Sequence, residues 1–362
     1  MDSVSGWERG KSSNLDGWWV ESERKFRWPE EYLVEAEGEV EAPIVDLAGF
    51  IAGDEEATRA AAALVSQACL SHGFFQVINH GIDSGLMGEA LLHSDAFFKL
   101  PLHRKLSVGA GTGTGTKGGS LWGYSGAHTH RFSSRLPWKE TLSFPFPHTY
   151  TNYFSSNIGQ DFAHAGVVFH KYCEGMKELG LKLMELLGIS LGVDRRHYRD
   201  FFEDGKCIMR CNYYPPCQDP SLVLGTGPHS DPTSLTILHQ DQVGGLQVFL
   251  HNKWRFLPPL PNALLINIGD TFTALSNGRY KSCVHRAVVK RYMERRSLAF
   301  FVCPKEDKVV RPPQDLVVRD GTKMYPDFTW SDFLHFTQNH YRADDATLHN
   351  FTHWFLSSKP TH

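Results

Sequence analysis

The spacing His-x-Asp occurs three times in this chain. It is found at His93 and Asp95, at His229 and Asp231, and at His239 and Asp241. Side chains two residues apart in a β-strand point to the same face, so one such pair can bring an imidazole and a carboxylate to one metal ion. In a helix, residues two apart do not face each other. Because the chain contains 19 histidines, one His-x-Asp pair is expected by chance. The surroundings of each pair must therefore show whether it can bind a metal.

Only the second pair has surroundings that favour a metal site. The first pair falls in a segment whose apolar pattern predicts a helix from about 84 to 98. The third pair stands where an apolar strand gives way to the turn DQVGG, and we expect a solvated strand end there. The second pair follows a GTG turn and opens a β-branched run. We therefore place His229 and Asp231 at the rim of a barrel, where side chains can reach a ligand.

A third ligand of a suitable type lies in another β-rich run. The segment SCVHRAVV supplies His285, 54 residues after Asp231. Two imidazoles and one carboxylate on one side of a metal leave the opposite positions open, which is the donor set of non-haem Fe(II) oxygen chemistry. Taken alone, His285 is equally well interpreted as a residue that caps a strand.

Four polar side chains accompany these candidates at the spacing of strands. Arg295 and Ser297 are two apart at the head of one strand, and Asn212 and Tyr214 are two apart in RCNYYPPC. The fork of an arginine binds a carboxylate with two parallel hydrogen bonds, and a serine hydroxyl can share the same oxygens. We therefore expect a small acid in the same barrel, with one end on the metal and the other on Arg295.

The hydrophobic pattern predicts the elements that position these side chains. Residues 1–42 are polar and acidic, and we expect a loosely ordered extension. Residues 43–205 form a helical region that packs on the core, with a flexible Gly- and Thr-rich loop at 109–119. Residues 206–305 contain seven short β-rich runs, typical of a jelly roll, and residues 306–362 form a helical cap. We predict one α+β unit with a mainly β core: a double-stranded β-helix (jelly roll) flanked by N-terminal and C-terminal helices.

Composition narrows the class of protein. The formal net charge of −3 gives no reason to expect a nucleic-acid partner. Seven cysteines without a CxxC pair predict reduced thiols rather than a zinc ribbon or a disulfide scaffold. The N-terminal residues lack a signal-peptide core, and no run approaches 18 apolar residues. We expect a soluble monomer, cytoplasmic or also nuclear, with no membrane partner.

Several motifs occur in a fixed order over roughly residues 43 to 355. They are HGFFQVINHG, NYYPPC, HSD, LSNGRYKSCVHRAVV and RRSLAFF, and together they resemble the plant Fe(II)/2-oxoglutarate-dependent dioxygenases. Within that family, LPWKETLSF and IGDTFTALSNGRYKSC are similar to the gibberellin 20-oxidases. The Gly- and Thr-rich loop is longer than expected for the family and would affect access if it borders the pocket.

The resemblance implies the cofactors and most of the site. The cofactors are Fe(II), 2-oxoglutarate as co-substrate, O2, and ascorbate as reductant. The iron ligands are His229, Asp231 and His285. The residues for 2-oxoglutarate are Arg295, Ser297, Tyr214 and Asn212, with Arg295 and Ser297 on the distal carboxylate. No catalytic side chain is expected beyond the iron site.

The resemblance also implies a substrate, a diterpenoid acid whose C-20 methyl is oxidised to alcohol and aldehyde and then lost. Such a rigid acid requires a mainly apolar pocket and one anchor for its carboxylate. The candidate substrate residues are Leu136, Trp138, Lys139, Glu140 and Arg135. Trp138 would form a wall, and Lys139 or a basic residue near Arg131 and Arg135 would be the anchor. A competing interpretation makes Lys139 and Glu140 an exposed ion pair of little energetic value.

Three alternatives remain at this point. The chain is another plant dioxygenase, such as a gibberellin 3-oxidase, a gibberellin 2-oxidase or a flavonoid oxygenase, because the iron and 2-oxoglutarate residues do not separate these. It is a non-catalytic jelly roll that binds a hormone, which the complete ligand set argues against. It is a zinc hydrolase, although no base or nucleophile is evident near the metal.

Overall fold

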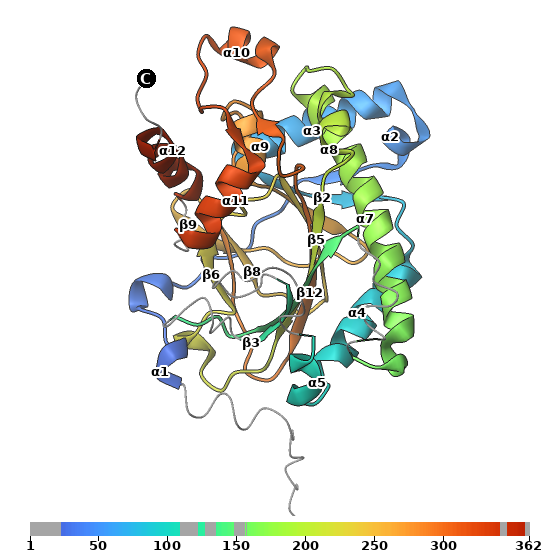
Figure 1. Cartoon of the computed structure of the whole chain (residues 1–362), viewed down its shortest axis with the longest axis vertical. Coiled ribbons are helices and arrows are strands. Elements are labelled where there is room, and N and C mark those ends of the chain that lie inside the picture. Colours follow the sequence, from blue (N-terminus) through green and yellow to red (C-terminus); the bar gives the residue numbers. More distant parts are fainter. Residues whose placement is uncertain are drawn as a thin grey trace, which may run out of the picture.

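The computed structural model describes residues 23–108, 122–126, 135–147, 156, 158–340 and 346–358. Within these ranges the strands form a large sheet of eight strands, a small sheet of four strands and a two-stranded ribbon. Figure 1 shows helices α3, α4, α7 and α8 along one side of the strands, whereas α11 and α12 lie on the other side. The predicted α+β jelly roll flanked by helices is confirmed.

The large sheet supplies one wall of the barrel. Its strands in spatial order are β1 (Ile44–Asp46), β2 (Phe74–Ile78), β10 (Leu264–Ile268), β7 (Leu235–Gln240), β12 (Arg295–Val302), β5 (Cys207–Tyr214), β4 (Glu140–Phe146) and β3 (Gly123–Gly126). Only the β1–β2 pair of this sheet is parallel. Most of these strands read as near-continuous apolar runs because helices cover one face and the barrel interior lies on the other.

The small sheet carries the opposite wall. Its order is β6 (Thr226–His229), β11 (His285–Ala287), β8 (Leu246–Leu250) and β9 (Lys253–Phe256). The ribbon pairs β13 (Val309–Val310) with β14 (Phe328–Thr329). The β-rich runs predicted between residues 206 and 305 all contain a strand.

Three of the longer helices begin at side-chain caps. The longer ones are α3 (Glu55–Ser71), α4 (Ser84–Phe98), α7 (Ala163–Ser190), α11 (Trp330–Asn339) and α12 (Thr347–Ser358). Asp54 and Asp83 accept backbone N–H bonds at the starts of α3 and α4, and Thr329 with Asp332 forms a capping box on α11. The shorter ones are α1 (Glu23–Phe26), α2 (Ala48–Ala52), α5 (Leu102–Leu106), α8 (His197–Phe202), α9 (Asp270–Leu275) and α10 (Gln314–Asp320), with 3-10 turns at Glu30–Tyr32, Gln160–Phe162 and Pro220–Leu222. No described helix has the length and apolar character needed to span a membrane.

The third His-x-Asp pair differs from its prediction. We expected a solvated strand end, but His239 is buried in β7, and its Nδ1 lies 3.4 Å from the hydroxyl of Tyr172 in α7. The reason is strand parity, because Thr236 and Leu238 line the barrel interior and their neighbour His239 must face the helices. His239 is therefore excluded from a metal site in the barrel because its side chain faces the helices rather than the barrel interior.

The N-terminal extension also differs from its prediction in the part that the structure describes. Arg286, only 2% exposed, donates from Nη1 to the carbonyl of Tyr32 at 2.6 Å and from Nη2 to that of Val34. Trp28 packs on Gly227, where an added Cβ would lie 2.1 Å from the indole. Residues 23–42 are thus packed against the small sheet, because buried aromatic side chains anchor a segment whose acidic side chains face solvent. The loop at 109–119 lies outside the described residues.

We predict that Trp28→Ala lowers the free energy of unfolding by about 3 kcal/mol, because Trp28 is only 9% exposed and removing its indole leaves a cavity. Urea unfolding followed by circular dichroism measures this loss. Val34→Ala is the matched control, since its side chain is 56% exposed and its carbonyl bond to Arg286 is unaffected; we expect a change within about 0.5 kcal/mol. Equal small losses in both variants would contradict the packed arrangement.

Candidate metal centre and its cavity

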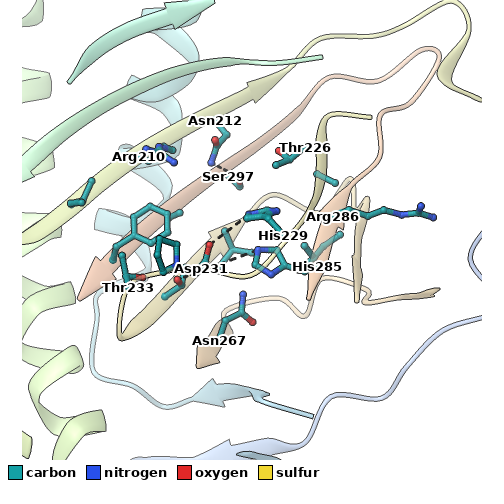
Figure 2. A pocket seen from close by; sticks show the side chains of 18 of the residues that line it. Arg210, Asn212, Thr226, His229, Asp231, Thr233, Asn267, His285, Arg286 and Ser297 are labelled. Carbon is teal, nitrogen blue, oxygen red and sulfur yellow. Dashed lines mark hydrogen bonds and ion pairs between the residues drawn. The ribbon is translucent and has the colours of Figure 1, made fainter. Parts of the chain in front are cut away.

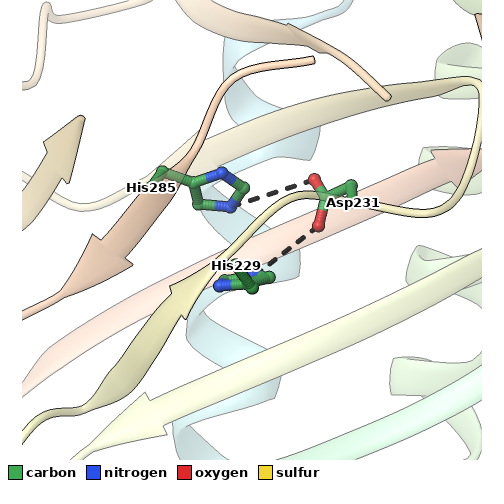
Figure 3. Close-up of side chains that lie close together, drawn as sticks. All are labelled: His229, Asp231 and His285. Atoms are coloured by element: carbon green, nitrogen blue, oxygen red, sulfur yellow. Dashed lines mark ion pairs between the residues drawn. The ribbon is translucent and has the colours of Figure 1, made fainter. Parts of the chain in front are cut away.

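The three candidate metal ligands meet at the edge of the small sheet. His229 ends β6, His285 begins β11, and the antiparallel register places them directly opposite each other, with ring centroids 4.3 Å apart. Asp231 follows β6 and turns back toward both rings (Figure 3). Its Oδ1 lies 3.6 Å from Nε2 of His229, and its Oδ2 lies 3.9 Å from Nε2 of His285. One donor atom from each residue lies within 4.8 Å of the others, which suits a shared cation.

The backbone orients both imidazoles. Nδ1 of His229 lies 2.9 Å from the carbonyl oxygen of Gly227, and Nδ1 of His285 lies 3.0 Å from that of Cys283. A carbonyl only accepts hydrogen bonds, so each Nδ1 carries the proton and each Nε2 presents its lone pair toward Asp231. Such bonds to the far ring nitrogen hold a histidine in the tautomer and orientation that a metal requires.

The protonation states also suit a metal. Burial lowers the pKa of His229 to about 3, and the neighbouring His285 adds to the effect, so His229 is neutral near pH 7. Burial by itself raises the pKa of Asp231, but His285, His229 and the 2.6 Å hydrogen bond from Thr236 outweigh it and hold that pKa below its usual value. A neutral imidazole and an ionised carboxylate are the forms that bind a metal.

Sequence reasoning missed two residues that support this centre. Thr236 Oγ1 donates to Asp231 Oδ2, and it belongs to β7 in the opposite sheet. Asp270 is buried, accepts from the hydroxyl of Ser230 at 3.0 Å, and donates its backbone N–H to the carbonyl of Asp231 at 2.8 Å. Burial raises the pKa of Asp270 to about 7. An acidic residue two positions after the buried strand LLINI was the available signal for Asp270.

One cavity runs from the metal centre along the inner face of the large sheet (Figure 2). Alternate residues of two neighbouring strands line it: Tyr214, Asn212, Arg210 and Ile208 from β5, and Arg295, Ser297, Ala299 and Phe301 from β12. In the antiparallel register, Arg295 pairs with Tyr214 and Phe301 pairs with Ile208. The cavity therefore follows the direction of these two strands. At about 3.3 Å per residue, its ends at Arg295 and Phe301 are roughly 20 Å apart.

The end at Arg295 is polar and holds the predicted co-substrate residues together. The Arg295 guanidinium is 4.9 Å from the ring centroid of Tyr214, and its Nη2 donates to Gln240 at 2.8 Å. Its Nε is buried without a hydrogen-bond partner among the described residues. Asn212 donates to the hydroxyl of Ser297 at 3.3 Å. A buried arginine normally has a counter-ion, so this end is suited to an anionic ligand.

The end at Phe301 is mainly apolar. Trp330 and Leu334 of α11 contribute to its lining, together with Ile208 of β5. The backbone N–H of Trp330 bonds to the carbonyl of Lys308, which follows the end of β12, so the start of α11 lies at this end of the cavity. An apolar chamber beside a metal centre is suited to a bulky hydrocarbon skeleton.

The residues expected to bind substrate have different locations. Leu136 is buried in a small apolar cluster beside Phe26, and Trp138 donates from Nε1 to the carbonyl of Pro215 at 3.1 Å. Arg135 is exposed and lies over the ring of Tyr32. None of these three lines the cavity. Arg131 lies outside the described residues.

Lys139 and Glu140 are not the exposed ion pair of the competing interpretation. Both are buried, at 6% and 4% exposure. Glu140 accepts from Lys105 at 2.5 Å and from the hydroxyl of Tyr124 at 2.7 Å. Lys139 lines the polar end of the cavity. Adjacent residues at the start of β4 point to opposite sides, so the two side chains are separated by the sheet.

Two family models match the chain. Residues 205–304 match the 2OG-Fe(II) oxygenase superfamily, and residues 42–158 match the N-terminal model described as non-haem dioxygenase in morphine synthesis. Gibberellin 20 oxidase 3 of Arabidopsis thaliana is 52% identical over 346 residues, which cover 93% of this chain and 90% of that protein. Gibberellin 20 oxidase 2 of Oryza sativa subsp. indica is 54% identical over 335 residues, which cover 91% and 84%.

Solved structures with the same fold come from related enzymes. The crystal structure of JOX2 in complex with 2OG, Fe and JA has a TM-score of 0.77 at 29% identity, covering 91% of this chain and 93% of JOX2. The rice dioxygenase for auxin oxidation has a TM-score of 0.70 at 26% identity, covering 85% of this chain and 99% of the other. These similarities agree with a jelly-roll oxygenase fold.

We predict that Thr236→Val weakens the binding of a divalent metal by about 10–100-fold, because the variant keeps its shape and loses the hydrogen bond that orients Asp231. Titration with Mn(II), followed by the paramagnetic resonance signal of the free ion, measures the affinity. Thr233→Val is the matched control, since Thr233 also lines the cavity but its buried hydroxyl has no described partner. Equal affinities in both variants would sink this role of Thr236.

Proposed function

Because the chain belongs to the 2OG-Fe(II) oxygenase superfamily and matches gibberellin 20 oxidases over about nine-tenths of its length, we propose that it oxidises C-20 of twenty-carbon gibberellins. It is a dioxygenase whose cofactors are Fe(II) and 2-oxoglutarate. The observation that carries the site assignment is the His229–Asp231–His285 cluster at a cavity with one cationic end and one apolar end.

In this proposal His229, Asp231 and His285 hold the iron, which supplies the activation of O2 when bound. The donor set fits, because two imidazoles and a carboxylate on one side leave open positions for ligands. Arg295, Ser297, Tyr214 and Asn212 are the residues for 2-oxoglutarate. Each round of oxidation consumes one 2-oxoglutarate and one O2 and releases succinate and CO2, and successive rounds convert the C-20 methyl to alcohol and aldehyde before its loss.

The apolar end would hold the diterpenoid skeleton. Phe301, Trp330 and Leu334 line this end, which supports a role for them in excluding water from the reacting carbon. Among the described cations that line the cavity, Arg210 lies nearest this end, because it is two residues from Ile208 on β5 and faces the same side. Its Nε donates to the hydroxyl of Ser143 at 3.0 Å, which fixes the guanidinium. We assign Arg210, which sequence reasoning did not single out, as the anchor of the substrate carboxylate.

We predict that the purified protein with Fe(II), ascorbate, 2-oxoglutarate and O2 converts a twenty-carbon gibberellin into the C-20 alcohol, the aldehyde and then nineteen-carbon products. Mass spectrometry of the gibberellins and of succinate measures both half-reactions. Asp231→Ala, which removes a proposed iron ligand, should abolish both. Succinate with a gibberellin hydroxylated elsewhere would favour a 3- or 2-oxidase instead, and succinate with an oxidised flavonoid would favour a flavonoid oxygenase.

We predict that Arg210→Met raises KM for the gibberellin by about 10–100-fold, because a charge-assisted hydrogen bond is worth about 1.5–3 kcal/mol and about 1.4 kcal/mol is tenfold. The KM for 2-oxoglutarate should change less than about twofold, since the co-substrate occupies the other end. Initial rates with each substrate varied in turn measure both constants. Arg135→Met, which removes an exposed arginine outside the cavity, is the control; an unchanged gibberellin KM in Arg210→Met would refute the assignment.

A further inference from the structure

Lys139 is a buried cation that no described carboxylate neutralises. Its side chain lines the polar end of the cavity, and no acidic oxygen of the described residues lies within 4 Å of its Nζ. Among the described residues that line the cavity, the sole acidic one is Asp231, which faces the two histidines. A fully buried lysine is rare without a paired anion, so this arrangement points to an anionic ligand at Lys139.

The neighbours of Lys139 are the residues proposed for 2-oxoglutarate. Its Nζ lies 3.4 Å from Oδ1 of Asn212, and the amide nitrogen of Asn212 donates to Ser297 at 3.3 Å. The same Nζ is 6.0 Å from the ring centroid of Tyr214, which also lies under Arg295. Two cations therefore lie against one aromatic ring, and Lys139 also contacts the Asn212–Ser297 pair. Together these side chains form one polar subsite suited to an anion.

The fold directs Lys139 into this subsite. Glu140 pairs with Tyr213 at the start of β4, so the preceding residue lies beside Tyr214. Trp138 fixes the approach, because its backbone N–H bonds to Leu224 and its indole to Pro215. With Glu140 held on the opposite side by Lys105, the LPWKET segment presents Lys139 alone to the cavity.

We propose that Lys139 binds the distal carboxylate of 2-oxoglutarate beside Arg295, so that LPWKET serves the co-substrate rather than the gibberellin carboxylate. This inference rests on the proposed function of the cavity as the 2-oxoglutarate site. The opposite-charge contact accounts for a lysine that burial would otherwise disfavour: burial lowers its pKa to about 8, while Tyr214 and Asp231 oppose that shift. Arg295 supplies the bidentate fork and Lys139 supplies a second point charge on the same oxygens.

The test measures binding of 2-oxoglutarate to the Mn(II)-loaded full-length protein by calorimetry, without turnover. Lys139→Met should raise the Kd of 2-oxoglutarate by about 10–100-fold, and Lys139→Arg should recover most of the loss. Lys105→Met is the matched control, because Lys105 is the other buried lysine of this region but pairs with Glu140 outside the cavity. Its Kd should stay within about twofold of the wild type.

Thermal unfolding separates a ligand contact from a structural role. The Tm of ligand-free Lys139→Met should not fall, because an unneutralised buried charge is removed, and the rise in Tm on adding 2-oxoglutarate should shrink. Lys105→Met should unfold at a lower temperature, because it leaves the buried carboxylate of Glu140 without its ion-pair partner.

A Lys139→Met variant that keeps the wild-type Kd for 2-oxoglutarate would overturn the inference, and a raised gibberellin KM in that variant would return Lys139 to the substrate. In both cases wild-type binding of 2-oxoglutarate leaves the proposed function standing. A wild-type protein that fails to bind 2-oxoglutarate would overturn the proposed function together with the inference.

Discussion

The antiparallel pairing of β6 with β11 is the constraint on which the site depends. It sets His229 opposite His285, and a slip of one residue would turn one imidazole to the other face of the sheet. The outer face of these strands is held accordingly. Trp28 packs on Gly227, and Arg286 is fixed by carbonyls of the N-terminal segment, so Arg286 points away from the metal centre while the adjacent His285 points into it (Figure 2). The segment before the first strand thus supports the candidate metal ligands.

The alternation of side chains between the two faces of a strand also determines which residues of β5 and β12 line the cavity. Cys211 and Met209 of β5 are buried on the helix side, whereas Asn212 and Arg210 face the interior. A single register therefore orders the cavity wall, from the cationic end at Arg295 to the apolar end at Phe301. In the proposed function, 2-oxoglutarate and the gibberellin would occupy different lengths of this cavity and would be bound by different cations.

Strand alternation places two residues that are adjacent in the chain on opposite sides of the sheet. Lys139 and Glu140 look like an ion pair in the sequence, yet the start of β4 sends one into the cavity and the other to Lys105 behind the sheet. Burying Lys139 without a carboxylate partner among the described residues costs stability, and in our proposal a bound dianion would offset that cost. The Nε of Arg295, which has no hydrogen-bond partner among the described residues, is likewise consistent with a ligand, because buried polar groups left unsatisfied by the protein are often satisfied by a bound molecule.

Residue types and local spacing by themselves determined the jelly-roll class, most strand and helix positions and the choice of the second His-x-Asp pair, and they singled out Arg295 and Ser297, which the structure places on the cavity wall. These follow from periods of two and of 3.6 residues and from ligand chemistry, which are local properties. Tertiary structure alone decided the rest. Thr236 meets Asp231 across the two sheets, Arg210 lies in the cavity two residues from Ile208, and residues 23–42 pack although they are acidic. Such contacts join residues distant in the chain, and a linear pattern carries no information on which distant surfaces will meet.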